Sequence, residues 1–412
     1  MDRLLSRVAL ARTWTLILAA LLAIALHGEA IARERALALV DEVQELVQKN
    51  FYNPEGLAGF KAEMERGRKE VQSGADPDEI ITRSLNALDA SHTGRFTPDQ
   101  IEYFELMDIF RPGGKRRAAL FPPEGTVTYA GIGIAPRMFE GRPFIAHVYH
   151  GSPAERAGLH AGDEILAVDG KPYEPIGSFA GKAGRNAAVQ VRREPDKPAI
   201  TLDVPVITIE PNDMFRNAIR SSARVFERGG HRIGYVRLWS YAARGVEQLL
   251  TELVSSEPLK DADGLVLDLR SRWGGAPPDA AEMFIGRSRD MTFINRSGKE
   301  TAVNARWRKP LVAIIDHGTR SGMEILAYSL KHAGVPLIGT ATAGAVLAGR
   351  GFLLNDNSLL EVAVADVKVD GRQLEGARVP PDIGVSYDIR YANGADPQFE
   401  RAVTELVDKL AQ

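Results

Sequence analysis

The sequence predicts an α/β protein with a helical region at its N-terminal end and a strand-rich domain inserted before the α/β core. Three observations predict this class. Apolar residues recur at helical spacing in residues 31–118, short strands alternate with glycine turns in residues 128–208, and apolar strands alternate with helical stretches in residues 209–412. A chain of 412 residues is long enough for two or three domains of ordinary size.

The composition narrows the class of protein further. Hydrophobic residues make up 44% and charged residues 25%, a balance typical of folded globular chains. The formal net charge is −3, which gives no electrostatic ground for nucleic acid as the main partner. The chain has no cysteine, so disulfides, thiolate metal sites and cysteine nucleophiles are excluded. No spacing typical of a metal site is present, and we expect no metal and no cofactor.

The first thirty residues read as a targeting segment. An uncharged run, Trp14 to Leu26, is too short to span a membrane and follows three basic residues: Arg3, Arg7 and Arg12. Gly28 and Ala30 supply the small residues for cleavage after Ala30. Residues 1–30 therefore predict export, with a bacterial periplasm as the destination. The alternative is an uncleaved anchor in the inner membrane, which leaves the rest of the chain facing the periplasm.

The next region is expected to be mostly helical. A helix is predicted to end at Asn50 or at the Asn53-Pro54 pair. The sequence Thr97-Pro98-Asp99-Gln100 forms a capping box with proline in the first helical position, which predicts a helix start at residue 98. Residues 111–127 are rich in Arg, Gly, Lys and Pro and are expected to form a linker.

The strand-rich domain, residues 128–208, has a recognisable order of elements. These are a strand opened by Gly131-Ile132-Gly133-Ile134, a strand at Phe144–Tyr149, a short helix within 151–159, and a strand closed by the turn Asp169-Gly170. This order resembles a PDZ domain, which implies binding of an extended peptide by strand addition. Ile132, Gly133 and Ile134 match the loop whose amides capture a terminal carboxylate. The alternative is a PDZ fold that serves only as a spacer.

The last region is expected to alternate strands with helices. Four apolar runs fit buried strands, namely Ile233–Leu238, Gly264–Leu269, Leu311–Asp316 and Pro336–Gly339. Helices are predicted at Leu249–Val254, at Met323–His332 and over about 397–410.

Ser321 lies where a predicted strand turns into a predicted helix. At a helix N-terminus the dipole and the free amides favour developing negative charge. A serine hydroxyl is a weak nucleophile and needs a base. The alternative is that Ser321 only caps the helix, which is the common role of serine in that position.

Three blocks in residues 209–412 resemble the C-terminal processing peptidases, serine peptidases with a crotonase-like ββα core. The first is Gly264 to Arg270 with Trp273-Gly274-Gly275, the second is the turn around Ser321 with Glu324, and the third is Leu374-Glu375-Gly376 with Val379 to Asp382. The resemblance implies that Ser321 is the nucleophile. It also implies an oxyanion hole built from the amides of Gly274 or Gly275 and of Gly322.

The chain departs from that family at the base. Most members carry a lysine in a Thr-x-Gly-Lys motif, and the matching stretch here is Thr342-Ala343-Gly344-Ala345. Lys331 lies ten residues beyond Ser321 on the same predicted helix, about 15 Å of rise, which is too far.

A second branch, the tricorn protease core, uses a Ser-His-Ser-Glu tetrad. Ser91-His92 stands in the matching place, and Phe51-Tyr52-Asn53-Pro54 upstream also resembles that branch. The resemblance implies that His92 is the general base and that Ser91 and Glu375 complete the hydrogen-bond network. The alternatives are that His92 is an exposed turn residue, that Glu375 is a surface carboxylate, or that His317 is the base.

The sequence therefore predicts an exported serine endopeptidase that cleaves polypeptides with free C-termini near those ends. Its PDZ domain would bind the substrate tail. We expect contact with a membrane only through an uncleaved N-terminal segment. The alternatives are a non-catalytic binding protein with a degenerate core and a PDZ scaffold.

Overall fold

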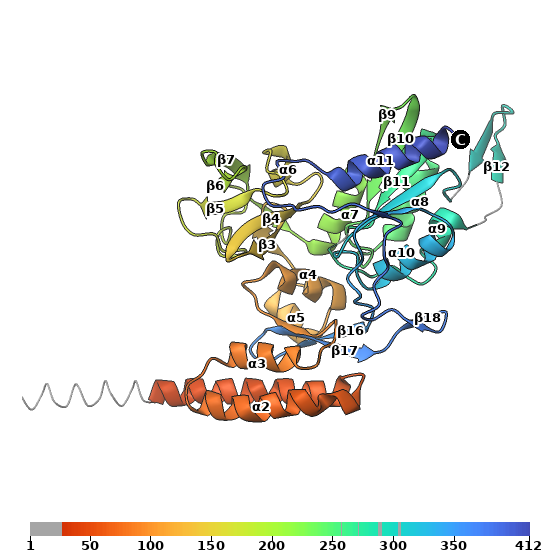
Figure 1. Cartoon of the computed structure of the whole chain (residues 1–412). Coiled ribbons are helices and arrows are strands. Elements are labelled where there is room, and N and C mark those ends of the chain that lie inside the picture. The colour runs from red at the N-terminus through yellow and green to blue at the C-terminus, as the bar shows by residue number, and fades with distance from the viewer. Residues whose placement is uncertain (1–26, 257, 271, 287–290, 304–305) are drawn as a thin grey trace, which may run out of the picture. The chain divides into compact units, whose positions relative to one another are not determined.

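The computed structural model describes residues 27–256, 258–270, 272–286, 291–303 and 306–412 (Figure 1). Most of the predicted export segment, residues 1–26, lies outside these ranges. Within them, no helix combines the length and the apolar character needed to cross a bilayer. The chain divides into two compact units, and the second contains Phe96–Gly351 and Ala365–Gln412.

The first unit, described over residues 27–95 and 352–364, is mainly helical. Residues 27–50 are helical, which confirms the predicted end at Asn50. The further elements are η1 (Pro54–Gly56), α2 (Leu57–Gln72), α3 (Pro77–Asn86), β1 (Gly94–Phe96) and β17 (Leu359–Ala365). Arg83 ties α3 to α2 through ion pairs with Glu63 and Glu70, both at 2.9 Å. Ser91 and His92 lie in the loop between α3 and β1.

The second unit opens with two helices that differ from the prediction. α4 (Ile101–Phe110) begins three residues later than expected. The reason is that the Thr97 amide donates to the Gln100 side chain at 2.9 Å and closes a turn ahead of the helix, while Gln100 itself has an extended backbone. The predicted linker 111–127 contains α5 (Lys115–Leu120), because its Lys-Arg-Arg-Ala-Ala-Leu run consists of good helix formers.

The strand-rich domain is a five-stranded antiparallel sheet in the order β3-β4-β5-β6-β7. Its strands are β3 (Ile134–Phe139), β4 (Arg142–Val148), β5 (Glu164–Val168), β6 (Asn186–Arg192) and β7 (Ile200–Pro205), and α6 (Pro153–Arg156) follows β4. A separate pair, β2 (Tyr129–Gly131) and β8 (Ile207–Ile209), closes the domain. β3 is an edge strand, so one side of its backbone faces no strand of this sheet.

The α/β core is a six-stranded sheet in the order β20-β15-β14-β11-β10-β9. Its strands are β9 (Arg224–Arg228), β10 (His231–Arg237), β11 (Gly264–Asp268), β14 (Leu311–Ile315), β15 (Leu337–Gly339) and β20 (Ile383–Gly384). All neighbours are parallel except β9 and β10. Every residue of β11 and β14 is buried, as expected for central parallel strands. The carboxyl ends of these strands meet at one edge of the sheet.

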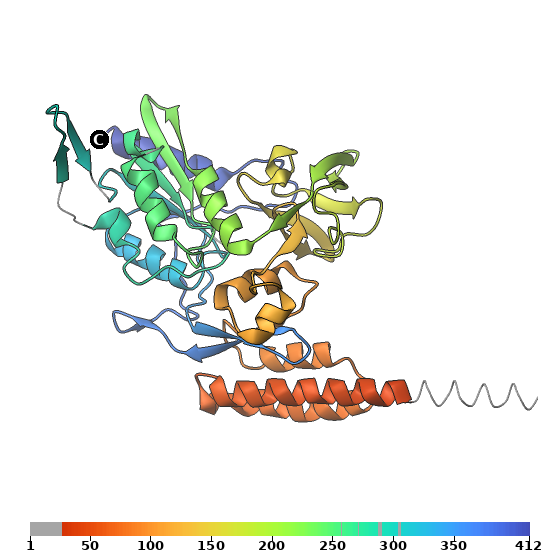
Figure 2. The same ribbon diagram turned by 180° about the vertical axis from the view of Figure 1, so that it is seen from behind.

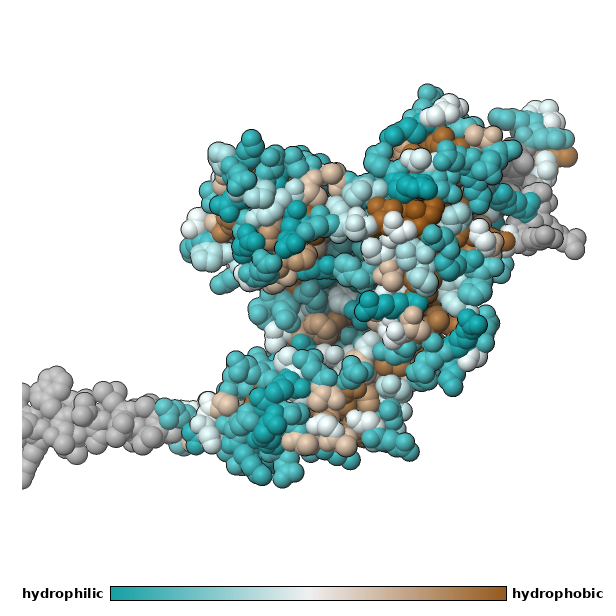
Figure 3. Space-filling view, in the orientation of Figure 1, coloured by the Kyte–Doolittle hydropathy of each residue, from teal (hydrophilic) through white to brown (hydrophobic). Residues whose placement is uncertain are grey.

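Helices flank this sheet (Figures 1 and 2). α11 (Pro397–Leu410) buries Ala402, Val403 and Leu406 against β10, β11 and β14. The other core helices are α7 (Pro211–Ser222), α8 (Val246–Ser255), η2 (Leu259–Asp261), α9 (Glu282–Ile285) and α10 (Gly322–His332). The remaining strands are β12 (Met291–Ile294), β13 (Glu300–Val303), β16 (Ala348–Leu353), β18 (Lys368–Val369) and β19 (Arg372–Gln373). Hydrophilic residues cover most of the face in Figure 3.

Candidate active site

Ser321 occupies the turn between β14 and α10, as the sequence predicts. Its backbone has φ 56° and ψ −134°, a left-handed conformation that is unfavourable for any residue but glycine. Ser321 is the N-cap of α10, but its hydroxyl makes no capping hydrogen bond to the described helix. The side chain is half-buried. The hydroxyl is thus not used as a helix cap, and the turn resembles the strained strand-to-helix turns that carry nucleophiles.

A glycine loop packs directly against this turn. A Cβ built on Gly274 would lie 2.5 Å from the Ser321 Cβ and 2.7 Å from the Arg320 carbonyl oxygen. A Cβ on Gly322 would lie 2.3 Å from the Ala276 carbonyl oxygen. A side chain at either position would therefore force the neighbouring backbone to shift. The structure thus brings the predicted oxyanion residues beside the predicted nucleophile.

Gly275 supports the same loop from its other side. It has φ 87°, and a Cβ there would lie 2.5 Å from the backbone of Ala242. The Gly274 carbonyl accepts a hydrogen bond from the Tyr241 amide at 3.0 Å. These contacts fix the plane of the peptide that carries the Gly275 amide.

The segment 342–345, where the resembling family carries its lysine, lies next to the nucleophile. The Ser321 amide donates to the Ala345 carbonyl oxygen at 2.7 Å. The fully buried Glu324 carboxylate accepts from the Thr342 hydroxyl at 2.5 Å and from the amides of Gly344 and Ala345 at 2.7 and 2.6 Å. Burial raises the pKa of Glu324, and these hydrogen bonds oppose that rise. Glu324 therefore anchors this segment to the first turn of α10.

Glu375 binds the chain that follows. Its carboxylate accepts from the amides of Val346 and Leu347 at 2.7 and 3.2 Å. Glu375 is half-buried, so it is not the ordinary surface carboxylate of the alternative interpretation. Glu375 thus holds the two residues that directly follow Ala345, whose carbonyl oxygen accepts from the Ser321 amide.

Ser91 and His92 belong to the first compact unit. The Ser91 hydroxyl and His92 Nδ1 lie 2.9 Å apart, within hydrogen-bond distance. His92 has φ 53° and is 9% exposed, so the expectation of an exposed turn residue does not hold. The pairing of His92 with Ser321 remains a prediction.

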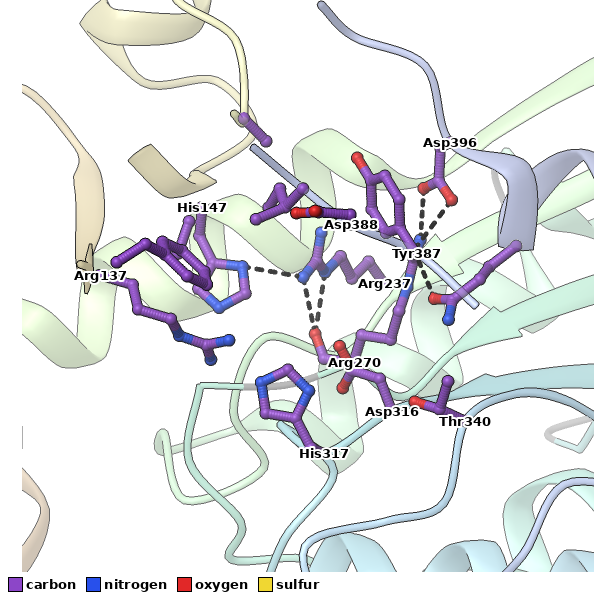
Figure 4. Close-up of a pocket in the computed structure, with 15 residues that line it drawn as sticks. Arg137, His147, Arg237, Arg270, Asp316, His317, Thr340, Tyr387, Asp388 and Asp396 are labelled. Carbon is purple, nitrogen blue, oxygen red and sulfur yellow. Dashed lines mark hydrogen bonds and ion pairs between the residues drawn. The ribbon is translucent and has the colours of Figure 1, made fainter. Parts of the chain in front are cut away.

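His317, the rival base, lines a cavity of about 210 Å³ at the carboxyl ends of the parallel strands (Figure 4). Its neighbours there include Arg137, Arg237 and Asp316, and Ser321 is not among the lining residues. Burial lowers the pKa of His317, and the negative charge of Asp316 partly offsets this effect.

Lys331 is held away from the role of a base by its own contacts. Its ammonium group donates to the Pro380 carbonyl oxygen at 3.0 Å and forms an ion pair with Asp382. No group of described His, Asp or Glu side chains could hold a metal ion.

Sequence reasoning missed a buried ion-pair network at the end of β11. Arg270 donates from Nε to Asp268 Oδ1 at 2.9 Å and from Nη2 to Oδ2 at 2.7 Å, and it also binds Asp396, the N-cap of α11. Burial alone would raise the pKa of Asp268, but the guanidinium groups of Arg270 and Arg237 lower it well below its usual range. The network fixes the start of the glycine loop. The only signal in the sequence was two charged residues at the end of an apolar strand.

Comparisons with known proteins agree with this architecture. A model of peptidase family S41 matches residues 232–385, and a model of the PDZ domain matches residues 144–183. The carboxyl-terminal-processing protease of Synechocystis sp. is 28% identical over 281 residues, which are 63% of this chain and 64% of that protein. The carboxy-terminal processing protease CtpA of Bacillus subtilis is 26% identical over 285 residues, 65% of this chain and 59% of that protein. The chain thus spans about three fifths of the length of these two relatives.

Solved structures show a likeness of fold. The tricorn protease has a TM-score of 0.53 at 19% identity, covering 92% of this chain and 37% of that one. Mature CPAF has a TM-score of 0.51 at 11% identity, covering 92% of this chain and 98% of that one. The predicted α/β fold with N-terminal helices and an inserted PDZ domain is confirmed, and a crotonase-like core is consistent with these neighbours. The peptidase family S41 model thus matches the α/β core of this chain, and the PDZ model matches part of its strand-rich domain.

Proposed function

We propose that this chain is a serine endopeptidase that processes polypeptides near their C-termini after export. The observation that carries the proposal is the strained turn at Ser321, whose hydroxyl is not used as a helix cap and against which only the backbone of Gly274 fits. The family S41 match over this segment supports the same conclusion. The processing of C-terminal tails rests on the names of the curated relatives. Nothing in the described residues or the comparisons favours a non-catalytic alternative.

In the proposed reaction, the Ser321 hydroxyl attacks the carbonyl carbon of the scissile peptide bond while the His92 imidazole takes its proton. A histidine that donates from Nδ1 to Ser91 presents at Nε2 the lone pair that this step requires. The C=O electron pair moves to oxygen, and the amides of Gly274 or Gly275 and of Gly322 stabilise the oxyanion. The C–N bond then breaks, the amine leaves with the proton from His92, and water releases the acyl group in the same way.

The PDZ domain is proposed to bind the substrate tail. The edge position of β3 supports strand addition, since Ile132 and Gly133 precede that strand and Ile134 begins it. Gly133 has φ 82°, and a Cβ there would lie 2.4 Å from the Ser152 Cβ, so the loop needs glycine. Export through residues 1–30, with the mature chain in the periplasm or anchored facing it, belongs to the same proposal.

Labelling with a fluorophosphonate probe tests the proposal. We expect the purified protein to be labelled at Ser321 and to cleave an unstructured peptide with an apolar C-terminus. Ser321→Ala is expected to abolish both reactions. Stable folding without labelling and without cleavage of any unstructured peptide would overturn the proposal.

A further inference from the structure

A fully buried carboxylate on α4 has no role in the site described so far. Glu105 is 0% exposed, and its carboxylate accepts three hydrogen bonds. The donors are the Tyr149 hydroxyl at 2.9 Å, Arg272 Nε at 3.0 Å and Trp273 Nε1 at 2.8 Å. Arg272 also donates to Glu102, one turn earlier on α4, at 2.6 Å. Arg272 Nε and Trp273 Nε1 can only donate, so Oε2 of Glu105 is the acceptor in both contacts. Burial raises the pKa of Glu105, and the Arg272 guanidinium opposes that rise.

The three donors come from segments that are far apart in the sequence. Arg272 and Trp273 immediately precede Gly274, the residue packed against Ser321. Tyr149 follows β4 of the PDZ domain, and its amide donates to the Gly133 carbonyl oxygen at 3.0 Å. One carboxylate therefore lies between the glycine loop of the core and the predicted peptide-binding loop.

We propose that Glu105 is a positioning residue of the peptidase site. It holds the side chains of Arg272 and Trp273, and through them it keeps the Gly274 backbone against Ser321. The inference rests on the proposed function, since it assigns a role in that same site. Glu105 touches no reacting atom, and its effect passes entirely through the loop.

The other hydrogen bonds of the glycine loop do not replace those that Glu105 accepts from the side chains of Arg272 and Trp273. Asp268 fixes Arg270 before the loop, and the Tyr241 amide fixes the Gly274 carbonyl within it. The Arg272 amide donates to the Trp239 carbonyl oxygen at 2.9 Å, which holds the backbone but not the side chain. Among the described residues, the Arg272 guanidinium forms ion pairs with Glu102 and Glu105 alone. The loss of the Glu105 charge would remove one of the two ion pairs of Arg272 and would weaken the hydrogen bond from the indole N–H of Trp273, so the loop would shift.

The variant Glu105→Gln tests this role, because it keeps the size of the side chain and removes the charge. We expect kcat for a peptide substrate, and the rate of fluorophosphonate labelling of Ser321, to fall about 10- to 100-fold, since oxyanion geometry tolerates little displacement. KM and the affinity for a PDZ-binding peptide, measured by fluorescence anisotropy, should stay within about twofold of wild type. Glu105→Asp keeps the charge and should recover part of kcat.

A matched control lies in the same unit. Asp163 is also 0% exposed, and its side chain binds Arg193 at 2.9 Å and the His160 amide at 3.0 Å, neither of which belongs to the glycine loop. We expect Asp163→Asn to lower the thermal unfolding midpoint comparably and to leave kcat unchanged. If kcat of Glu105→Gln stays near wild type, or falls equally in Asp163→Asn, the inference is overturned and the proposed function stands. A wild-type protein that is neither labelled nor active overturns both.

Tyr149→Phe keeps the inference testable if Glu105→Gln does not fold. This variant removes the donor that holds Glu105 Oε1, so the carboxylate is oriented less firmly toward Arg272 and Trp273. A loss of kcat smaller than that of Glu105→Gln, at unchanged KM, therefore supports the inference. An unchanged kcat with an unchanged labelling rate counts against it.

Discussion

The amide of Ser321 donates to the carbonyl oxygen of Ala345 at 2.7 Å. The residue that stands where the resembling peptidases carry their lysine is therefore in direct contact with the backbone of the proposed nucleophile. A methyl group cannot take a proton, so another part of the chain has to supply the base. His92 is our candidate, and its pairing with Ser321 leads to the first prediction.

Removal of the imidazole should abolish turnover. We expect His92→Ala to lower kcat by about 10³-fold or more, as loss of a triad base does in serine peptidases. In the wild type, kcat/KM should rise between about pH 6 and pH 7, because histidine loses its proton there and only the neutral ring accepts one. A pH series of peptide cleavage checks both results. Full activity in His92→Ala would move the base to another residue, and His317→Ala is the companion variant.

A lysine introduced at position 345 should partly replace the missing histidine. In the His92→Ala background, we expect Ala345→Lys to restore fluorophosphonate labelling of Ser321, with a rate that rises at alkaline pH as the amine loses its proton. Ala345→Met has a similar length without an amine and is the matched control. Equal labelling of the two double variants would show that the amine plays no part.

Gly274 should tolerate no side chain. The Cβ of Gly274→Ala would lie 2.5 Å from the Ser321 Cβ, so the loop has to move away from the nucleophile. We expect labelling of Ser321 to slow at least 100-fold, the scale of losing an oxyanion donor. Gly384→Ala is the control, because nothing lies within 4 Å of a Cβ there. Normal labelling in Gly274→Ala would remove the glycine loop from the proposed oxyanion hole.

The carboxylate of Asp268 should make stability depend on pH. Because its pKa is lowered in the folded protein, its contribution is complete above the pKa of the unfolded chain, about 3.9, and is lost as pH falls toward the folded value. We expect the difference in unfolding free energy between wild type and Asp268→Asn to be constant above about pH 5 and to shrink below it. Denaturant titrations followed by tryptophan fluorescence can measure it, since Trp239 and Trp273 are buried in the same unit.

The control for this measurement is an exposed ion pair. Asp388 binds Arg390 with 59% of its side chain exposed, so Asp388→Asn should change stability by less than about 1 kcal/mol. A difference for Asp268→Asn that stays equally large at pH 3 would contradict the assigned ion pairing.

A substitution in the peptide-binding loop should change the affinity for a peptide and not the rate at which the peptide bond is cleaved. Gly133→Ala places a methyl group 2.4 Å from the Ser152 Cβ, and we expect weaker binding of a peptide with a free carboxylate. Cleavage of a short peptide that does not reach the PDZ domain should keep its kcat. The control ligand is the PDZ-binding peptide with its C-terminal carboxylate converted to an amide. Equal affinity of the wild-type protein for the free and the amidated peptide would argue against carboxylate capture.

Local patterns in the sequence were enough to predict the main elements of the core. The apolar run at β14 and the helical spacing after Ser321 gave the strand, the turn and α10 within one residue. The start of α4 was wrong, because a capping box can close a turn ahead of a helix as well as inside it. α5 was missed, because glycine and proline flank a six-residue helix.

The site was only partly predictable, for a physical reason. The glycine loop and Ser321 stand in local motifs, so resemblance was enough to find them. Glu105 accepts from residues 149, 272 and 273, and no local pattern joins it to them. The roles of His92 and Glu375 rest on resemblance, since spacing along the chain says nothing about distance in the fold.

The left-handed backbone at Ser321 has a practical consequence for trapping a bound peptide. An alanine at this position would keep the unfavourable dihedral angles, whereas a glycine would adopt them freely and would still remove the hydroxyl. Ser321→Gly should therefore melt at a higher temperature than the parent and be the better choice for crystals that hold an uncut peptide. A single substitution would thus remove the reactive hydroxyl and also make the folded protein more resistant to heat.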